Sequence, residues 1–102
     1  MDKKPKKLTA AAAKQRLLLI LEHGRIAYTE HCANVRMPQR NVTPLDVEFL
    51  FEDGTVTDNT KWSDDYQNWQ YRIEGTDIEG EELKVVTIII EEYLMARVIT
   101  VF

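Results

Sequence analysis

Residues 28–54 have the sequence YTEHCANVRMPQRNVTPLDVEFLFEDG, and the rest of the chain is arranged around them. The second half of this stretch carries a strong helix start, in which Thr43 is a good N-cap and Pro44 suits the first helical position. Asp46 lies three residues after the cap, where the free amides of the first turn favour a carboxylate. These signals predict a helix over residues 44–53.

The chain before this stretch predicts another helix. Thr9 is a good N-cap, the alanines that follow it favour helix, and Gly24 is expected to supply the left-handed residue that ends the helix. Residues 17–21 are apolar without a break, which leaves the last turns with little polar surface. We therefore expect this helix either to be buried or to be covered by a partner chain along residues 8–23.

The segment between the two helices carries weaker signals. Residues 25–29 alternate briefly and predict a short strand or an extended connector. Residues 30–37 are compatible with a short helix. Pro38 is expected to end that helix, because the residue before a proline avoids the helical region of backbone space.

Beyond Gly54 the apolar pattern takes the period of β-strands. Gln70 and Arg72 alternate with apolar neighbours, so they belong to the face opposite the helices. The fold predicted is α+β, with the N-terminal helices packed on one face of a roughly four-stranded antiparallel sheet. The strands are expected at residues 55–57, 69–74, 83–90 and 97–102, with a polar loop over 58–68.

Charge is distributed unevenly along the 102 residues. Residues 1–40 hold nine Lys and Arg against three Asp and Glu, whereas residues 41–102 hold four against fourteen. Residues 1–7 carry four lysines and no apolar periodicity, which predicts a flexible basic tail before a single domain over 8–102. A nucleic-acid surface should draw mainly on the basic first forty residues, and the acidic remainder would repel phosphate.

The composition also bounds the class of protein. Hydrophobic residues make up 44% of the chain, which is typical of a globular domain, and no apolar run is long enough to span a membrane. The charged N-terminus is not a secretory signal, and the single cysteine, Cys32, forms no internal disulfide. We expect a cytoplasmic protein with no membrane partner. The two histidines and the cysteine lack metal-ligand spacing, so no metal and no cofactor is predicted.

The pattern of this chain resembles the small bacterial family called domain of unknown function 4258, over roughly residues 26–102. The likeness implies a relation to RelE-like toxins, including the motility quorum-sensing regulator toxin, which are small cytosolic ribonucleases neutralised by an antitoxin. The sheet departs from those ribonucleases because it carries many carboxylates. The resemblance is carried by Tyr28, His31, Arg36-Met37, Arg40, Val42-Thr43, Asp46-Val47, Gly54, Val56, Tyr71-Arg72-Ile73, Leu83-Lys84-Val85-Val86 and Val98-Ile99-Thr100-Val101.

Metal-independent RNA cleavage needs a proton acceptor, a proton donor and cations that stabilise the phosphorane charge. His31 is the candidate acid or base, because imidazole titrates near neutral pH. The candidate phosphate clamps are Arg36, Arg40 and Arg72, whose guanidinium groups present forked donors. Further binding candidates on the sheet are Gln70, Lys84 and Thr100.

A structural role for the same residues stays open. His31 is equally suited to bonding a helix end, and the arginines of the 28–54 stretch are suited to ion pairs with nearby carboxylates. The aromatic residues of the 58–68 region offer a similar choice between a hydrophobic cluster and a surface on which bases stack. These residues are Trp62, Tyr66 and Trp69.

Two functions therefore follow as hypotheses. The first is a toxin-like, metal-independent RNA endonuclease of a toxin–antitoxin system, either active or degenerate, with RNA or the ribosome as its target and an antitoxin on helix 8–23. The second is a non-catalytic protein-binding module of the same fold, such as an antitoxin-like, immunity or phage-encoded interaction protein.

Overall fold

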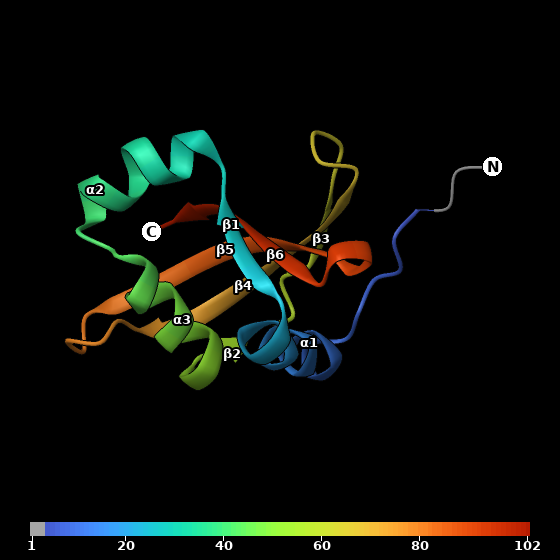
Figure 1. Ribbon diagram of the computed structural model, residues 1–102, viewed down its shortest axis with the longest axis horizontal. Helices are drawn as coiled ribbons and strands as arrows, with labels where there is room; N and C mark the ends of the chain where they lie inside the picture. The colour runs from blue at the N-terminus through green and yellow to red at the C-terminus, as the bar shows by residue number, and fades with distance from the viewer. Residues whose placement is uncertain (1–3) are drawn as a thin grey trace.

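The computed structural model describes residues 4–102 and has three helical segments packed on a six-stranded, mixed and mostly antiparallel sheet (Figure 1). The helical segments are α1 (Ala10–His23), a π-helical turn η1 (Cys32–Arg36) that continues into α2 (Met37–Arg40), and α3 (Pro44–Asp53). The strands are β1 (Arg25–Tyr28), β2 (Thr55–Val56), β3 (Lys61–Ser63), β4 (Asn68–Thr76), β5 (Glu82–Ile90) and β6 (Met95–Val101), and a 3-10 turn, η2 (Glu91–Tyr93), joins β5 to β6.

The predicted α+β class is confirmed, and the sheet is larger than the four strands expected. The strand order is β1-β6-β5-β4-β2, with β3 also paired to β4, and all pairs are antiparallel except β1 with β6. Tyr28 of β1 lies opposite Val98 of β6, seventy positions later in the chain. Such a distant pairing leaves no periodic signal in the sequence. β3 lies inside the region expected to be a loop, where Trp62 is opposite Trp69.

The two long helices begin where the sequence predicted. The left-handed conformation expected of Gly24 at the end of α1 was wrong, because its φ is −110°. Thr9 accepts a hydrogen bond from the amide of Ala12, and Thr43 and Asp46 form a complete capping box at the start of α3. The carbonyl oxygens at the end of α3 are bound by Lys14 of α1, a residue to which the sequence analysis assigned no role. The Lys14 ammonium donates to three carbonyl oxygens at that end, those of Phe51, Glu52 and Gly54, at 2.7–2.9 Å.

The expectation that Pro38 ends a helix was wrong. The chain stays helical from Cys32 to Arg40, with Pro38 inside the helical run. The preceding turn is widened to the π form, in which the amide of Met37 donates to the carbonyl of Cys32. An ordinary α-helix would have to lose a hydrogen bond and accommodate the proline ring against a carbonyl one turn earlier. The π turn changes that spacing, so the helix continues.

The hydrophobic core lies between the helices and one face of the sheet. Its helical members include Leu17, Met37 and Phe51, and its sheet members include Tyr71 and Val85. Gln70 and Arg72 alternate with the buried residues of β4 and belong to the opposite face, as the strand period predicted.

Strand β6 contains a bulge that sets which of its residues face the core. Thr100 pairs with Val86 and Val98 pairs with Thr87, so Ile99 is an extra residue in β6. As a result Val98 and Val101 are both fully buried, while Ile99 and Thr100 line the opposite face. A regular strand would have placed Val98 and Thr100 on the same face.

Candidate functional site

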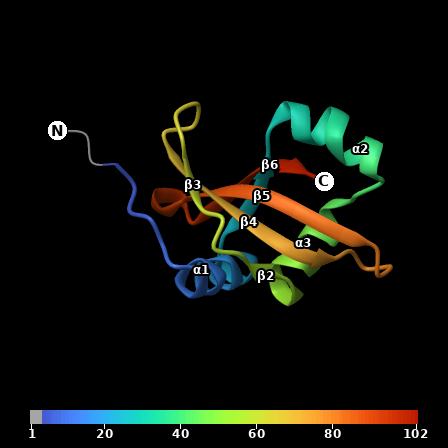
Figure 2. The same cartoon turned by 180° about the vertical axis from the view of Figure 1, so that it is seen from behind.

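Figure 2 views the molecule from behind, with strands β4 and β5 toward the viewer. The face of the sheet opposite α1 and α3 holds a concavity of about 510 Å³. Strands β3, β4, β5 and β6 all contribute to it, together with the segment that leads into β3. Its lining mixes two cations, amide and hydroxyl groups and apolar side chains with one carboxylate, that of Asp58. The lining residues used in the argument below are Lys61, Gln70, Arg72, Ile99, Thr100 and Phe102.

Arg72 is the central cation of this concavity. Its guanidinium carbon lies 4.7 Å from the centroid of the Phe102 ring, so the planar cation is placed over an aromatic face. Its Nε lies 3.1 Å from a carboxylate oxygen of Glu74. That Nε is buried and its N–H makes no hydrogen bond, so the contact with Glu74 is an ion pair with poor donor direction.

Arg36 lies outside the concavity and contacts one of the strands that line it. Its Nη2 donates to the carbonyl oxygen of Val101 at 3.2 Å, so it ties the end of η1 to the end of β6. Thr29 makes a second tie, because its amide donates to the carbonyl of Val98 and its hydroxyl to the carbonyl of Ile99. The start of the helical segment is therefore attached to the edge of β6 next to the concavity.

The other predicted site residues do not line the concavity. Arg40 is exposed and borders a separate hollow of about 330 Å³, whose lining includes Asp77, Glu79 and Glu81. His31 is exposed on the segment beside β6. Lys84 is half-buried on β5, with its ammonium 3.5 Å from a carboxylate oxygen of Glu82. The structure therefore gathers Gln70, Arg72 and Thr100, and it leaves His31, Arg36, Arg40 and Lys84 outside that concavity.

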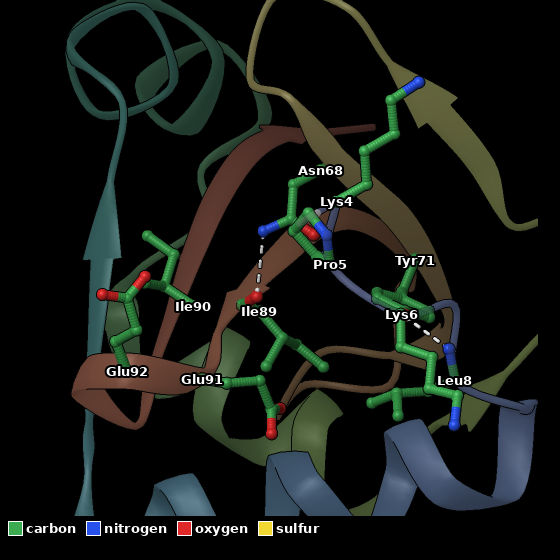
Figure 3. A pocket seen from close by; sticks show the side chains of 10 residues that line it. All are labelled: Lys4, Pro5, Lys6, Leu8, Asn68, Tyr71, Ile89, Ile90, Glu91 and Glu92. Atoms are coloured by element: carbon green, nitrogen blue, oxygen red, sulfur yellow. Dashed lines mark hydrogen bonds between the residues drawn. The ribbon is translucent and has the colours of Figure 1, made fainter. Parts of the chain in front are cut away.

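Sequence reasoning missed a second hollow, of about 410 Å³, between residues 4–8 and the sheet (Figure 3). Lys4 and Lys6 line one part of it, and Glu91 and Glu92 line another. The amide of Leu8 donates to the Tyr71 hydroxyl at 2.9 Å, which attaches the segment before α1 to the sheet (Figure 3). Residues 1–3 of the predicted basic tail lie outside the described residues.

Two tryptophans hold the rest of this segment. The rings of Trp62 and Trp69 meet edge to face with centroids 5.3 Å apart. The Lys4 ammonium lies 5.2 Å from the Trp62 ring and the Lys7 ammonium 5.5 Å from the Trp69 ring, and the indole N–H of Trp69 donates to the carbonyl of Pro5 at 2.9 Å. No local signal in the sequence joins these two regions, because Pro5 and Trp69 are 64 positions apart.

Several titratable groups are poorly suited to proton transfer at neutral pH. Burial raises the pKa of Tyr28 to about 12, with a further contribution from the Glu48 carboxylate. Burial also raises the pKa of Tyr71 and of the Cys32 thiol. Within residues 4–102, His, Cys, Asp and Glu side chains do not gather in groups of three or more that could hold a metal ion.

The comparisons with known proteins identify one family. The family described as "Domain of unknown function (DUF4258)" matches residues 28–102, which include every strand from β2 to β6 and the concavity described above. No curated protein and no solved structure matches the chain. Among residues 4–102, none of the helical segments has the length and apolar character needed to cross a membrane.

Proposed function

Because the chain belongs to the DUF4258 family, and because that domain contains the Arg72 concavity, we propose that it is a RelE-like, cytoplasmic RNA endonuclease that binds RNA on the open face of its sheet. The observation that carries the proposal is the combination of Arg72, Gln70 and Thr100 with Lys61 and the ring of Phe102 in one hollow. Cations attract phosphate, amides and hydroxyls bond base edges or sugar hydroxyls, and an aromatic ring stacks on a base.

The position of His31 suggests how cleavage follows binding. An RNA strand that crosses β4, β5 and β6 leaves the concavity at Ile99, where Thr29 joins the helical segment to β6. His31 lies two residues after Thr29 and is exposed to solvent. In this proposal Arg72 binds the phosphate, and His31 accepts the proton of the ribose 2′-hydroxyl as its oxygen attacks the phosphorus. The bond from phosphorus to the 5′-oxygen breaks, and His31 returns the proton to that leaving oxygen, without a metal ion.

The test separates binding from cleavage. Arg72→Gln should weaken the binding of a fluorescent single-stranded oligonucleotide about tenfold, because it removes charge-assisted hydrogen bonds to phosphate. Arg25→Ala is the control for loss of an arginine elsewhere, since Arg25 is exposed on β1 outside the concavity, whereas Arg72 is half-buried within it. His31→Ala should leave binding within about twofold and abolish cleavage of the same oligonucleotide. Unchanged binding by Arg72→Gln would remove the sheet face from consideration as an RNA site.

A second candidate function is a non-catalytic protein-binding module of the same fold. The separation of His31 from the Arg72 concavity favours it, because no histidine among residues 4–102 lines that hollow. Ordinary growth of cells that express the wild-type chain without an antitoxin, together with intact RNA in the cleavage assay, would favour this module over the nuclease.

A further inference from the structure

An apolar groove lies between α1 and α3, on the opposite side of the molecule from the Arg72 concavity. Its volume is about 780 Å³. Three of its large apolar side chains are open to solvent: Leu19 is 37% exposed, Leu45 is 64% exposed and Ile78 is 55% exposed. A cluster of exposed apolar residues indicates an interaction surface more strongly than a single exposed apolar residue does.

The groove has an acidic rim. Glu22 of α1 and Glu48 and Glu52 of α3 all line it, and no lysine or arginine among residues 4–102 does so. Lys14 of α1 precedes the lining residue Gln15, but its ammonium is held by the carbonyls at the end of α3. Arg25 lines an adjoining hollow that shares Leu21 and Glu48 with the groove. The floor is therefore apolar and the border is negative, without an internal positive charge to neutralise it.

We propose that this groove binds an amphipathic helix of a separate protein, with an apolar face that fills the floor and lysines or arginines along its borders. A helix of the partner can pack into the groove between α1 and α3, with rows of side chains on one helix filling the spaces between rows on the others. Charge complementarity with the glutamate rim selects a basic partner and disfavours an acidic one. The proposal is independent of RNA binding, because the Arg72 concavity shares no residue with the groove.

Three other occupants fit the observations less well. A second copy of this chain packed symmetrically through the same groove would bring its own glutamate rim against the first, and like charges repel. The described part of the N-terminal segment is engaged elsewhere, because Pro5 and Leu8 bond to Trp69 and Tyr71 on the sheet. A small ligand would find few fixed polar groups in the groove to orient it.

The experiment uses the full chain and a set of synthetic helical peptides of about 15 residues. Each peptide has leucines at positions i, i+3 or i+4, and i+7, in different registers, with lysines on both sides of that stripe; matched peptides carry glutamates in place of the lysines. At least one basic peptide should bind, and its acidic match should bind about tenfold more weakly. NMR shifts should appear at Leu18, Leu45 and Phe49, while the oligonucleotide of the RNA assay should shift Arg72 and Thr100.

Two variants locate the interaction. Leu45→Asp should weaken basic-peptide binding about tenfold or more, because it removes an apolar contact from the groove while remaining compatible with the exposed first turn of α3. Tyr93→Asp is the matched control, since Tyr93 is 70% exposed but lies on η2 outside the groove. Glu22→Lys with Glu48→Lys should reverse the preference toward the acidic peptides.

Three results would overturn the proposal. They are equal binding of basic and acidic peptides, no binding by any peptide of the set, and a wild-type dimer that Leu45→Asp converts to a monomer in analytical ultracentrifugation. Loss of RNA binding in Arg72→Gln with unchanged peptide binding would leave the groove proposal standing, so the two proposals fail separately.

Discussion

Asp46 links two distant parts of the chain at the level of one residue. Its carboxylate accepts hydrogen bonds from the amide of Thr43 at 2.9 Å, from the Thr43 hydroxyl at 3.0 Å and from the amide of Ile78 at 3.1 Å. The first two belong to the cap that the sequence predicted. The third joins α3 to the turn between β4 and β5, so the same carboxylate also positions that turn.

Asp46→Asn should lower the free energy of unfolding by about 1–3 kcal/mol at pH 7, because the amide cannot satisfy all of these donors. Desolvation raises the pKa of Asp46, but the bonds from Thr43 and Ile78 outweigh it and the net pKa is lowered. The carboxylate therefore stabilises the fold above its unfolded pKa of about 3.9, and this stabilisation is lost as pH falls through the lower folded pKa. Urea unfolding at pH 7 and pH 3 measures the difference.

The control for Asp46 is Asp65→Asn, at an exposed turn position. It should change the free energy of unfolding by less than about 0.5 kcal/mol at either pH. If Asp46→Asn lowered the free energy of unfolding as much at pH 3 as at pH 7, the pH dependence of stability would have to come from other carboxylates.

At the level of elements, the connection between α1 and β1 requires the backbone of Gly24 to lie very close to the backbone of Leu94. A Cβ built at Gly24 would lie 1.9 Å from the carbonyl oxygen of Leu94, which directly precedes β6. That oxygen also accepts the amide of Arg25. Because the obstacle is backbone and not a flexible side chain, a larger residue at position 24 must push α1 away from the sheet.

Gly24→Ala should therefore destabilise the fold by about 1–3 kcal/mol, the range for overpacking, despite the higher helix propensity of alanine. Gly80→Ala is a useful comparison, because Gly80 has φ of 90° but open space around it. Gly80→Ala should lower the free energy of unfolding by about 1 kcal/mol, through backbone strain alone. Thermal and urea unfolding measure the stability of both variants. An equal loss of stability in Gly24→Ala and Gly80→Ala would argue against a steric block at Gly24.

The extra residue in β6 shows why strand faces are hard to predict from alternation. A strict period of two would place Val98 and Thr100 on the same face, and the bulge at Ile99 separates them. Thr100 thereby joins Arg72 in the concavity while Val101 stays in the core. A bulge depends on pairing with β5, so the one-dimensional pattern does not reveal it.

At the level of the whole molecule, basic and acidic parts of the chain meet. The segment before α1 brings Lys4 and Lys7 against the two tryptophans and lies close to Glu91 and Glu92. Arg16 of α1 also pairs with Glu91 at 3.1 Å. The charge asymmetry along the sequence therefore becomes contacts between its two halves, in addition to any role in binding RNA.

Deletion of residues 1–7 should shift tryptophan emission to longer wavelength and lower the free energy of unfolding by about 1 kcal/mol. The deletion removes two cation–π contacts and the hydrogen bond from Trp69 to Pro5. The double variant Lys4→Gln and Lys7→Gln retains the Pro5 carbonyl, so it should lose only part of that stability. An unchanged emission spectrum in the deletion would mean that the segment does not cover the rings in solution.

Local chemistry in the sequence was sufficient to predict the two long helices with their N-caps, the α+β class and the alternation that sends Gln70 and Arg72 to the open face. N-caps and strand periods involve residues a few positions apart, and the chain order contains that information. The parallel pairing of β1 with β6 and the composition of the concavity depend on contacts between residues far apart in the chain. Those contacts form only when the core packs, so the gathering of Arg72 with Thr100, and the separation of both from Arg40, belong to the folded molecule alone.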